Sequence, residues 1–375
     1  MTQLSPSLPS SAYTSAEFFG NEKTHIFLRD WSAVCRSEEI TEPGAWQVID
    51  LAGEDLLLVR GQDGMPHAFY NVCRHRGARL CAGRDEKPRP GRAVLPNAVQ
   101  ANGAIRCPYH GWLYDFAGKL RGTPHIFESA DFRRGDYSLY PVAAMEWGGF
   151  VFLNPTPDGA APLAAQLGEM PERVARYDLA ALRIGHRIGY EVDANWKIIC
   201  ENYNECYHCA PVHPELVALV PAFRDQGGAS LDWQRGIPHR EGATTFSWSG
   251  TSSRAPLPAL DADERERHKG ELLYPNLFLS LASDHVAAFI LRPRGPERTN
   301  VDCLFLFAAE EIARADFAHE DVSGFWDVVN QQDWAICERV QAGMHARPHV
   351  QGYYAPMEDF NLDMRRYITS RLGLA

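Results

Sequence analysis

Hydrophobic and polar residues follow two different patterns along the chain, and the change between them divides it into segments. In residues 15–35 the apolar positions, among them Phe18, Ile26 and Trp31, recur with helical spacing. From residue 44 to 154 the apolar residues form short runs separated by Gly, Pro and Asp, which predicts β-strands joined by turns. Strands are expected at 46–51, 55–59, 68–71 and 149–153, and a long polar loop at 84–103.

From about residue 156 helical and strand patterns alternate. Helical spacing occupies 163–177, 194–209 and 324–343, and strand-like runs occupy 244–248, 277–281, 286–291 and 301–307. Strands flanked by helices predict an α+β domain with an antiparallel sheet. The first twelve residues are rich in Ser and Pro, so we expect a mobile tail. The predicted division is an N-terminal tail and helix at 1–40 that pack on the larger domain, a β module at 41–155, and the larger domain at 156–375.

The composition excludes several classes of protein. The 375 residues are 45% hydrophobic and 23% charged, which is typical of a globular protein. The formal net charge of −11 argues against nucleic acid or an anionic membrane as partner. No apolar run approaches the roughly 20 residues of a membrane helix, and no export signal is visible, so we expect a cytoplasmic protein. Nine cysteines are too few for a disulfide scaffold and are expected to be free, catalytic or metal-bound.

Two short loops of the β module carry residues that bind metals. One contains Cys73-x-His75 and the other Cys107-x2-His110, and a glycine follows each histidine closely. Such a set could hold zinc, or a [2Fe–2S] cluster with two cysteines on one iron and two histidines on the other. Zinc ribbons usually use Cys-x2-Cys pairs, so the spacing and the Gly-Trp pair after His110 favour the cluster.

A second group of metal-binding residues lies between 194 and 214. On a helix, Glu201, Glu205 and His208 would share one face. His208 and His213 would point about 140° apart on a continuous helix, but Pro211 should break it and let His213 turn back. Two histidines need a carboxylate to complete a facial triad for ferrous iron with positions open for dioxygen.

The carboxylate is expected from the helix at 324–343. Asp333 falls roughly 20–40° from Val329 and Val340 on the apolar face of that helix, whereas Asp327 falls well away from it. A charge on an apolar face is costly unless it is paired or bound to a metal. We therefore predict Asp333 as the third ligand.

With both groups of residues in view, the chain resembles the large subunit of a Rieske-type non-haem iron oxygenase over most of its length. The resemblance implies an α+β protein with a small all-β Rieske domain and a catalytic domain whose antiparallel sheet is covered by helices, like the START and Bet v1 folds. It implies O2 as co-substrate and electrons from NAD(P)H through a flavin- or ferredoxin-type reductase. It assigns the [2Fe–2S] cluster to Cys73, His75, Cys107 and His110, and a mononuclear Fe(II) to His208, His213 and Asp333.

The resemblance also implies an assembly. Members of this family form head-to-tail trimers, in which the cluster of one subunit lies beside the mononuclear iron of the next. An acidic residue, here Glu205, bridges a cluster histidine and an iron-ligand histidine. Many relatives carry aspartate at this position, and glutamate resembles the carnitine, betaine and stachydrine oxygenases.

That branch implies a small quaternary ammonium substrate, which is hydroxylated on an N-methyl group and thereby demethylated. A trimethylammonium group favours an aromatic cage, for which the candidates are Tyr203, Tyr207, Phe246 and Trp248. The alternative is a ring-hydroxylating oxygenase that acts on an aromatic acid or another apolar ring. A non-enzymatic electron carrier fused to a ligand-binding domain is a third reading, but it has no need of Glu205, His208, His213 and Asp333 together.

A basic segment follows the first cysteine loop. It contains Asp85 and Glu86 and seven basic residues, in a protein that is acidic overall. The sequence leaves open whether this segment is a solvated loop or a docking patch for an acidic ferredoxin or reductase. The basic residues are Arg74, Arg76, Arg79, Arg84, Lys87, Arg89 and Arg92.

Overall fold

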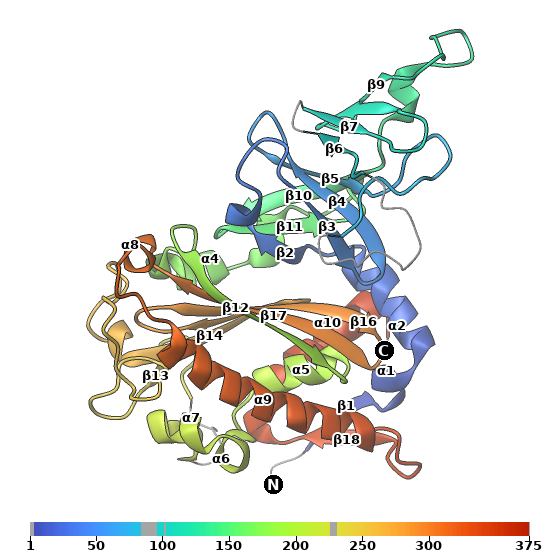
Figure 1. The fold of residues 1–375 in the computed structure, drawn as a ribbon. Coiled ribbons are helices and arrows are strands. Elements are labelled where there is room, and N and C mark those ends of the chain that lie inside the picture. The colour runs from blue at the N-terminus through green and yellow to red at the C-terminus, as the bar shows by residue number, and fades with distance from the viewer. Residues whose placement is uncertain (1–3, 84–95, 101–102, 226–230, 375) are drawn as a thin grey trace, which may run out of the picture. The chain divides into compact units, whose positions relative to one another are not determined.

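The computed structural model describes residues 4–83, 96–100, 103–225 and 231–374. Contacts between residues divide the chain into two compact units. One unit is Phe27–Leu163, and the other combines Met1–Ile26 with Ala164–Ala375. The larger unit is therefore discontinuous in sequence, with the smaller one inserted after its first helices (Figure 1). Residues 27–40 fall in the smaller unit, and the functional boundaries at 40 and 155 stay predictions.

The smaller unit contains two antiparallel sheets. One has the strand order β2-β11-β10-β5-β4-β3 and the other the order β6-β7-β8-β9. The four strands predicted in this region are all present within two residues of the expected ends. The elements are β2 (Ser32–Arg36), β3 (Trp46–Leu51), β4 (Glu54–Arg60), β5 (Pro66–Tyr70), β6 (Val99–Gln100), β7 (Ala104–Arg106), β8 (Leu113–Asp115), β9 (Leu120–Gly122), β10 (Pro141–Trp147) and β11 (Phe150–Asn154), with short helices η2 (Ser37–Ile40) and η3 (Arg134–Tyr137).

The helix predicted for 15–35 ends earlier than its periodicity suggests. Helix α2 (Ala16–Glu22) continues as a π-helical turn, η1 (Lys23–Phe27), and the chain then forms β2. All five residues of β2 are buried, and the strand pairs with β11. Tertiary strand pairing therefore overrides the local helical spacing in the last third of this segment.

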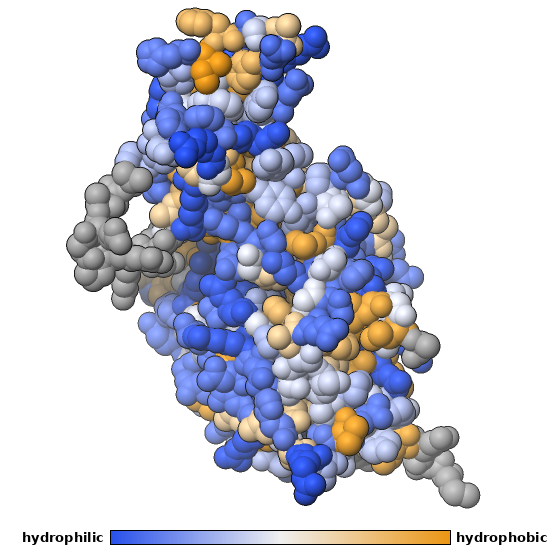
Figure 2. Space-filling view, turned by 90° about the vertical axis from the view of Figure 1, so that its right-hand side faces the viewer, coloured by the Kyte–Doolittle hydropathy of each residue, from blue (hydrophilic) through white to orange (hydrophobic). Residues whose placement is uncertain are grey.

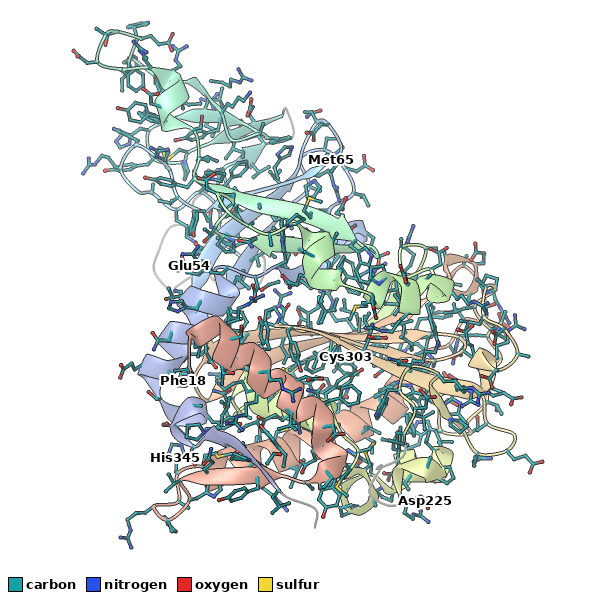
Figure 3. All side chains as sticks on the ribbon, turned by 180° about the vertical axis from the view of Figure 1, so that it is seen from behind. Phe18, Glu54, Met65, Asp225, Cys303 and His345 are labelled. Carbon is teal, nitrogen blue, oxygen red and sulfur yellow. A yellow bond between two sulfur atoms is a disulfide. The ribbon has the colours of Figure 1, made fainter. Side chains whose placement is uncertain are left out.

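The larger unit is built on one six-stranded antiparallel sheet with the order β12-β17-β16-β15-β14-β13. Helices α5 (Trp196–Tyr203), α9 (Glu320–Gly343) and α10 (Asp359–Leu372) lie on one side of this sheet (Figure 1). Side chains fill the layer between sheet and helices, as Figure 3 shows around Cys303, which is fully buried. The strands are β12 (Arg183–Val192), β13 (Ile237–Pro238), β14 (Arg267–Leu273), β15 (Leu277–Leu281), β16 (Val286–Gly295) and β17 (Arg298–Phe307). The predicted α+β class is confirmed.

Two predicted elements of the larger unit are corrected. The helical segment at 163–177 is broken into α3 (Leu163–Leu167), α4 (Met170–Arg173) and η4 (Ala175–Tyr177), because Gly168 adopts a φ of +53°. The strand expected at 244–248 is a loop, in which the amides of Thr244 and Thr245 both donate to the carbonyl of Gly250. Gly250 has a φ of +78°, which closes the chain on itself and prevents an extended strand.

The remaining elements are short. They are α1 (Ser11–Thr14), α6 (Cys209–Val212), α7 (Pro214–Leu219), η5 (Pro221–Phe223), η7 (Glu264–Glu266), α8 (Ala309–Ile312) and η8 (Pro356–Glu358).

Residues 5–14 form a strand and a short helix rather than the predicted mobile tail. Strand β1 (Ser5–Pro9) pairs antiparallel with β18 (Gln351–Tyr354). The hydroxyls of Tyr13, on α1, and Tyr354 both donate to Oε1 of Glu201 on α5, each at 2.6 Å. Segments near both ends of the larger unit therefore form hydrogen bonds with α5, the helix that precedes the candidate iron site.

No helix in the described ranges is long and apolar enough to cross a membrane. On the face shown in Figure 2, hydrophilic residues predominate and hydrophobic ones are scattered in small groups.

Candidate metal centres and a cavity beside the iron site

The two cysteine loops of the smaller unit, residues 73–78 and 107–112, share one backbone geometry. In each loop the glycine four residues after the cysteine, Gly77 or Gly111, donates its amide to the cysteine carbonyl at 3.1 Å. The cysteine amide in turn donates to the carbonyl five residues on, at 2.8 Å in both loops. The two glycines have φ values of +70° and +73°, a left-handed conformation that favours glycine. The glycines noted in the sequence thus shape two matched turns.

The loops place sulfur inside and imidazole outside. Cys73 and Cys107 are each 2% exposed, whereas the rings of His75 and His110 are exposed, with centroids 4.6 Å apart. A hydrogen bond from the Cys107 thiol lowers the pKa of Cys73 to about 6. Backbone amides also donate to both sulfurs, but the shared hydrogen bond with Cys73 and burial raise the pKa of the Cys107 thiol. Two buried cysteine sulfurs and two imidazoles at the protein surface fit a [2Fe–2S] cluster of the Rieske type.

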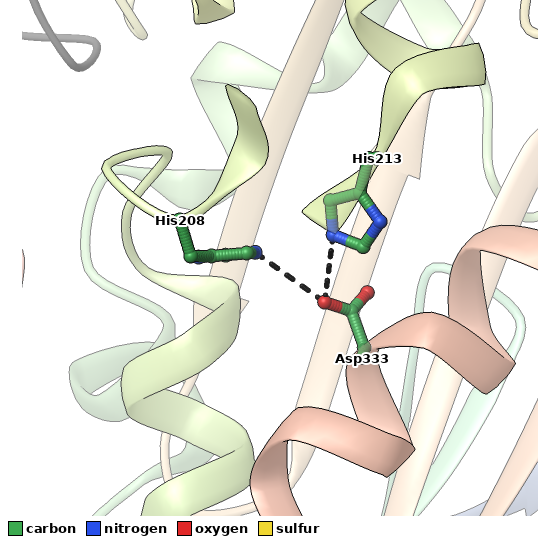
Figure 4. A group of neighbouring side chains, drawn as sticks. All are labelled: His208, His213 and Asp333. Carbon is green, nitrogen blue, oxygen red and sulfur yellow. Dashed lines mark hydrogen bonds and ion pairs between the residues drawn. The ribbon is translucent and has the colours of Figure 1, made fainter. Parts of the chain in front are cut away.

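His208, His213 and Asp333 converge in the larger unit (Figure 4). Oδ1 of Asp333 lies 2.9 Å from Nε2 of His213 and 3.3 Å from Nε2 of His208. The three potential ligand atoms lie within 4.8 Å of one another. Asp327, the rejected candidate, instead accepts a hydrogen bond from the Tyr190 hydroxyl at 2.8 Å. The donor set and its spacing fit one ferrous ion with open positions.

The backbone reaches this arrangement by a different route from the predicted one. Helix α5 ends at Tyr203, so Glu201, Glu205 and His208 do not share a helical face. Pro211 lies inside the short helix α6 and does not break it. The break falls at His213, whose φ of −120° and ψ of 74° leave the helical region because Pro214 follows and begins α7.

Hydrogen bonds fix both imidazole rings. Nδ1 of His208 lies 2.6 Å from Oε1 of Glu205, and Nδ1 of His213 lies 2.8 Å from Oε1 of Gln332. An oxygen atom accepts a hydrogen bond from Nδ1 of each ring. The Nε2 atoms of both rings therefore remain available to Asp333 and to a metal. Burial opposes a charged ring, but the carboxylates of Asp333 and Glu205 outweigh it and raise the pKa of His208 to about 10. Burial likewise opposes ionisation of Asp333, but the two imidazoles lower its pKa to about 2.

The cysteines around His208 correct one expectation. The sequence predicts cysteines that are free, catalytic or metal-bound, but Cys206 and Cys209 form a disulfide within the turn that carries His208. Their Cα atoms are 4.8 Å apart, which is within the range that a disulfide spans. Cys200 is buried and free, as expected.

A cavity of about 380 Å³ opens beside the triad. Tyr203 and Phe246 line it, but Tyr207 and Trp248 do not, and each of these two is 52% exposed. Trp248 does not line the cavity, because residues 244–248 form a loop and not the predicted strand. His268 and five aromatic residues that the sequence does not predict also line the cavity. The aromatic residues are Phe223, Trp233, Tyr274, Trp326 and Phe360. Only Trp326 left a signal in the sequence, because it lies seven residues before Asp333 on the same face of α9.

The basic segment is described only in part. Arg84, Lys87, Arg89 and Arg92 lie outside the described residues. Of the others, Arg79 pairs with Asp55 at 2.6 Å and Arg74 donates to the carbonyl of Ser138 at 2.6 Å. A role in docking a reductase stays a prediction.

Two protein-family models match the chain. Residues 30–133 match the model of the Rieske [2Fe-2S] domain, and residues 179–373 match that of the ring hydroxylating alpha subunit (catalytic domain). The carnitine monooxygenase oxygenase subunit of Escherichia coli (strain K12) is 34% identical over 344 residues, which cover 91% of this chain and 84% of that protein. The glycine betaine monooxygenase oxygenase subunit of Chromohalobacter salexigens is 27% identical over 389 residues, covering 95% and 83%.

The fold is also that of a solved structure. The quaternary ammonium Rieske monooxygenase CntA in complex with γ-butyrobetaine superimposes with a TM-score of 0.74 and 24% identity, covering 98% of this chain and 96% of that one.

Proposed function

Because the chain belongs to the family of ring-hydroxylating oxygenase alpha subunits that carry a Rieske [2Fe-2S] domain, we propose that it hydroxylates an N-methyl group of a small quaternary ammonium compound. One O2, two electrons and two protons give the N-hydroxymethyl compound and water. The hydroxymethyl group then leaves as formaldehyde, and the tertiary amine and one proton remain. The substrates that this proposal covers resemble glycine betaine, stachydrine or carnitine.

The observation that carries the proposal is the aromatic lining of a cavity that ends at the metal-binding triad. Tyr203, Phe246 and Trp326 line the same cavity as His208, His213 and Asp333. Aromatic faces attract a trimethylammonium group, which has no hydrogen-bond donor and is recognised mainly through its charge and shape. The cavity of about 380 Å³ falls within the range of sites that enclose small molecules.

We further propose roles for the residues around the two centres. Cys73, Cys107, His75 and His110 hold the cluster, and His208, His213 and Asp333 hold the iron. When bound, the cluster supplies electrons singly and the iron supplies O2 activation. Glu205 fixes the His208 ring through Nδ1 and accepts its proton as the charge on the site changes.

The oxygenase subunit requires a separate protein that delivers electrons to the cluster. We propose that the chain assembles as a homotrimer in which the exposed His75 and His110 of one subunit approach Glu205 of the next. The exposure of both imidazoles in the single chain supports this proposal, because the cluster would then lie at a surface available to another subunit.

The test compares two aspartate variants of one helix. We expect the wild-type protein to contain three irons per chain, Asp333→Asn to contain two, and Asp327→Asn to keep three, since Asp327 bonds only to groups outside the triad. Glycine betaine, carnitine or stachydrine should yield formaldehyde in step with O2 consumption, with reductant present. Two irons in the wild-type protein would indicate an electron carrier. Product formation from an aromatic acid and from no quaternary amine would establish the ring-hydroxylating alternative.

A further inference from the structure

The cavity contains one buried imidazole that no protein group satisfies. His268, at the start of β14, lines the cavity and is only 5% exposed. Its Nδ1 atom is buried without a hydrogen-bond partner, and across the described residues no hydrogen bond to either ring nitrogen is present. A buried polar group that lacks a partner costs roughly 1–3 kcal/mol, so a ligand that accepts a hydrogen bond from the other ring nitrogen, Nε2, would offset part of the cost of burying this ring beside a cavity.

A neighbouring imidazole shows the contrast. His285 is fully buried, with Nδ1 2.8 Å from Oδ1 of Asp284 and Nε2 accepting the indole N–H of Trp326 at 3.3 Å. Arg254 donates to the same Asp284 at 2.9 Å. This chain of buried groups fixes the ring of Trp326, which is a wall of the cavity. Among the described residues, the protein therefore satisfies His285 behind the wall and leaves His239 and His268 without partners, and of these two only His268 lines the cavity.

The protonation of His268 determines what it can bind. Burial lowers its pKa well below 6.5, and the nearby His239 and His285 add to this effect, so the ring is neutral and carries one N–H. Buried N–H groups without partners are rarer than buried acceptors without partners, so Nδ1 is assigned the lone pair. Nε2 then carries the hydrogen and is the donor that this lining residue can offer to a molecule in the cavity.

Two aromatic side chains connect His268 to the helix that carries Asp333. The ring of His268 packs on Phe246 with centroids 4.3 Å apart, and Phe246 in turn lies 5.3 Å from Trp326. Trp326 and Asp333 are seven residues apart on α9, which corresponds to about 10 Å along the helix. The guanidinium of Arg173, another lining group, is engaged by both carboxylate oxygens of Glu271 at 2.7 Å. A substrate oriented with its N-methyl groups at the triad would extend its other end towards His268.

We propose that His268 is a specificity-determining residue that donates a hydrogen bond to an oxygen atom on the tail of the quaternary amine, either a carboxylate or a hydroxyl oxygen. The inference rests on the proposed function and narrows its substrates to amines with such a tail. Phe246 and Trp326 hold the apolar part of the molecule, and His268 distinguishes its oxygen-bearing end.

The test measures equilibrium binding to the oxidised holoenzyme without O2. Three amines of similar length serve as probes: γ-butyrobetaine with a carboxylate, (4-hydroxybutyl)trimethylammonium with a hydroxyl, and butyltrimethylammonium with neither. In His268→Leu we expect the Kd to rise about 10- to 100-fold for the carboxylate if that is the natural tail, or about 3- to 10-fold for the hydroxyl. The Kd for butyltrimethylammonium should change by less than about 2-fold, because it makes no hydrogen bond.

Two further variants serve as controls for the binding measurements on His268→Leu. His268→Gln keeps an N–H donor and should recover part of the preference, while His186→Leu, whose ring stacks on His319 with centroids 4.0 Å apart and does not line the cavity, should bind all three amines like the wild type. If His268→Leu does not fold, His268→Phe replaces it with a ring. Equal losses for all three amines would mean that His268 only shapes the cavity, and unchanged values would mean that water is its partner; either result overturns the inference. A wild-type protein that binds none of the amines would instead refute the proposed function.

Discussion

At the scale of single residues, the sequence held most of the information about metal ligands and little about the cavity. His208 and His213 could be selected from their spacing, and Asp333 because a charge on the apolar face of a helix is costly unless it is paired or bound to a metal. The structure brings these three together, although the triad's function remains a proposal. Tyr207 and Trp248 could not be rejected from sequence, because the predicted helix and strand that carry them are a turn and a loop, in which both side chains are exposed. The sequence did not indicate His268, because the lack of a hydrogen-bond partner at its Nδ1 atom can be seen only in the folded structure.

Glu205 offers a residue-scale test of the electron route. Its Oε1 accepts from Nδ1 of His208, and its Oε2 accepts from the backbone amide of His208 at 3.1 Å. We expect Glu205→Ala to keep all three irons and the visible spectrum of the cluster but to lose at least about 10- to 100-fold in turnover. Iron analysis and single-turnover kinetics check this expectation. Product formation at the wild-type rate would remove Glu205 from the route.

Glu201 gives a test in pH. Its burial raises the pKa to about 7 from 4.5, and the hydrogen bonds from Tyr13 and Tyr354 reduce the shift without cancelling it. Between pH 4.5 and 7 the folded protein holds a proton that the unfolded chain has lost, so the free energy of unfolding should fall as pH rises through this range and then level off. Glu201→Gln removes this slope, so its stability relative to the wild type should increase from pH 5 to 7.5 in urea titrations. The exposed Glu191→Gln serves as control, and a difference that is constant with pH would contradict the assignment.

At the scale of elements, strands with isolated apolar runs were predicted well and segments that depend on distant partners were not. β3 and β15 have the predicted bounds because turn residues flank each run. β2 was predicted as helix because its residues carry no strand pattern of their own. The strand forms through its pairing with β11. The same holds for β1, which is a strand only because β18, more than three hundred residues later, lies beside it.

A glycine in the hairpin between β8 and β9 allows an element-scale test. A Cβ on Gly118 would lie 2.3 Å from the ring of Phe69 on β5, and Gly118 has a φ of +78°. Gly64 has a similar φ of +77° but has no atom within 4 Å of that position. Both Gly→Ala variants carry the cost of a left-handed residue, of about 1–2 kcal/mol, and only Gly118→Ala adds a clash. We expect Gly118→Ala to lose the visible absorbance of the cluster at a lower temperature than Gly64→Ala, and equal midpoints would show that Phe69 moves aside.

At the scale of the whole molecule, the two-unit organisation followed from the change in hydrophobic pattern. The sequence placed the β module and the α+β domain in order along the chain and predicted that residues 1–40 pack on the larger domain. The structure groups residues 1–26 with residues 164–375 but places residues 27–40 in the smaller unit, where β2 pairs with β11. The oligomeric assembly is harder still to predict from the sequence, because it depends on the surfaces of several chains.

Mixed oligomers test the proposed assembly. Cys107→Ser should lack the cluster and Asp333→Asn should lack the mononuclear iron, so each homo-oligomer should be inactive. When the two variants are co-expressed with different tags and purified through both, electrons can pass from the cluster of one chain to the iron of another. We expect such hetero-oligomers to regain a fraction of wild-type formaldehyde production. Complete inactivity, with both variants correctly assembled and loaded, would place the route within one chain.

The pairing of β1 with β18 has a consequence for biosynthesis. Residues 27–163, which form one compact unit, are all available once position 163 has left the ribosome, whereas the sheet partner of β1 appears only at 351–354. At roughly 5–20 residues per second, that interval lasts about 10–40 s. During this time the nascent chain carries a module able to receive its iron–sulfur cofactor while the first helices still await their partners. Cofactor loading during translation would therefore proceed in two stages, with the iron–sulfur centre first and the oxygen-activating iron after chain release.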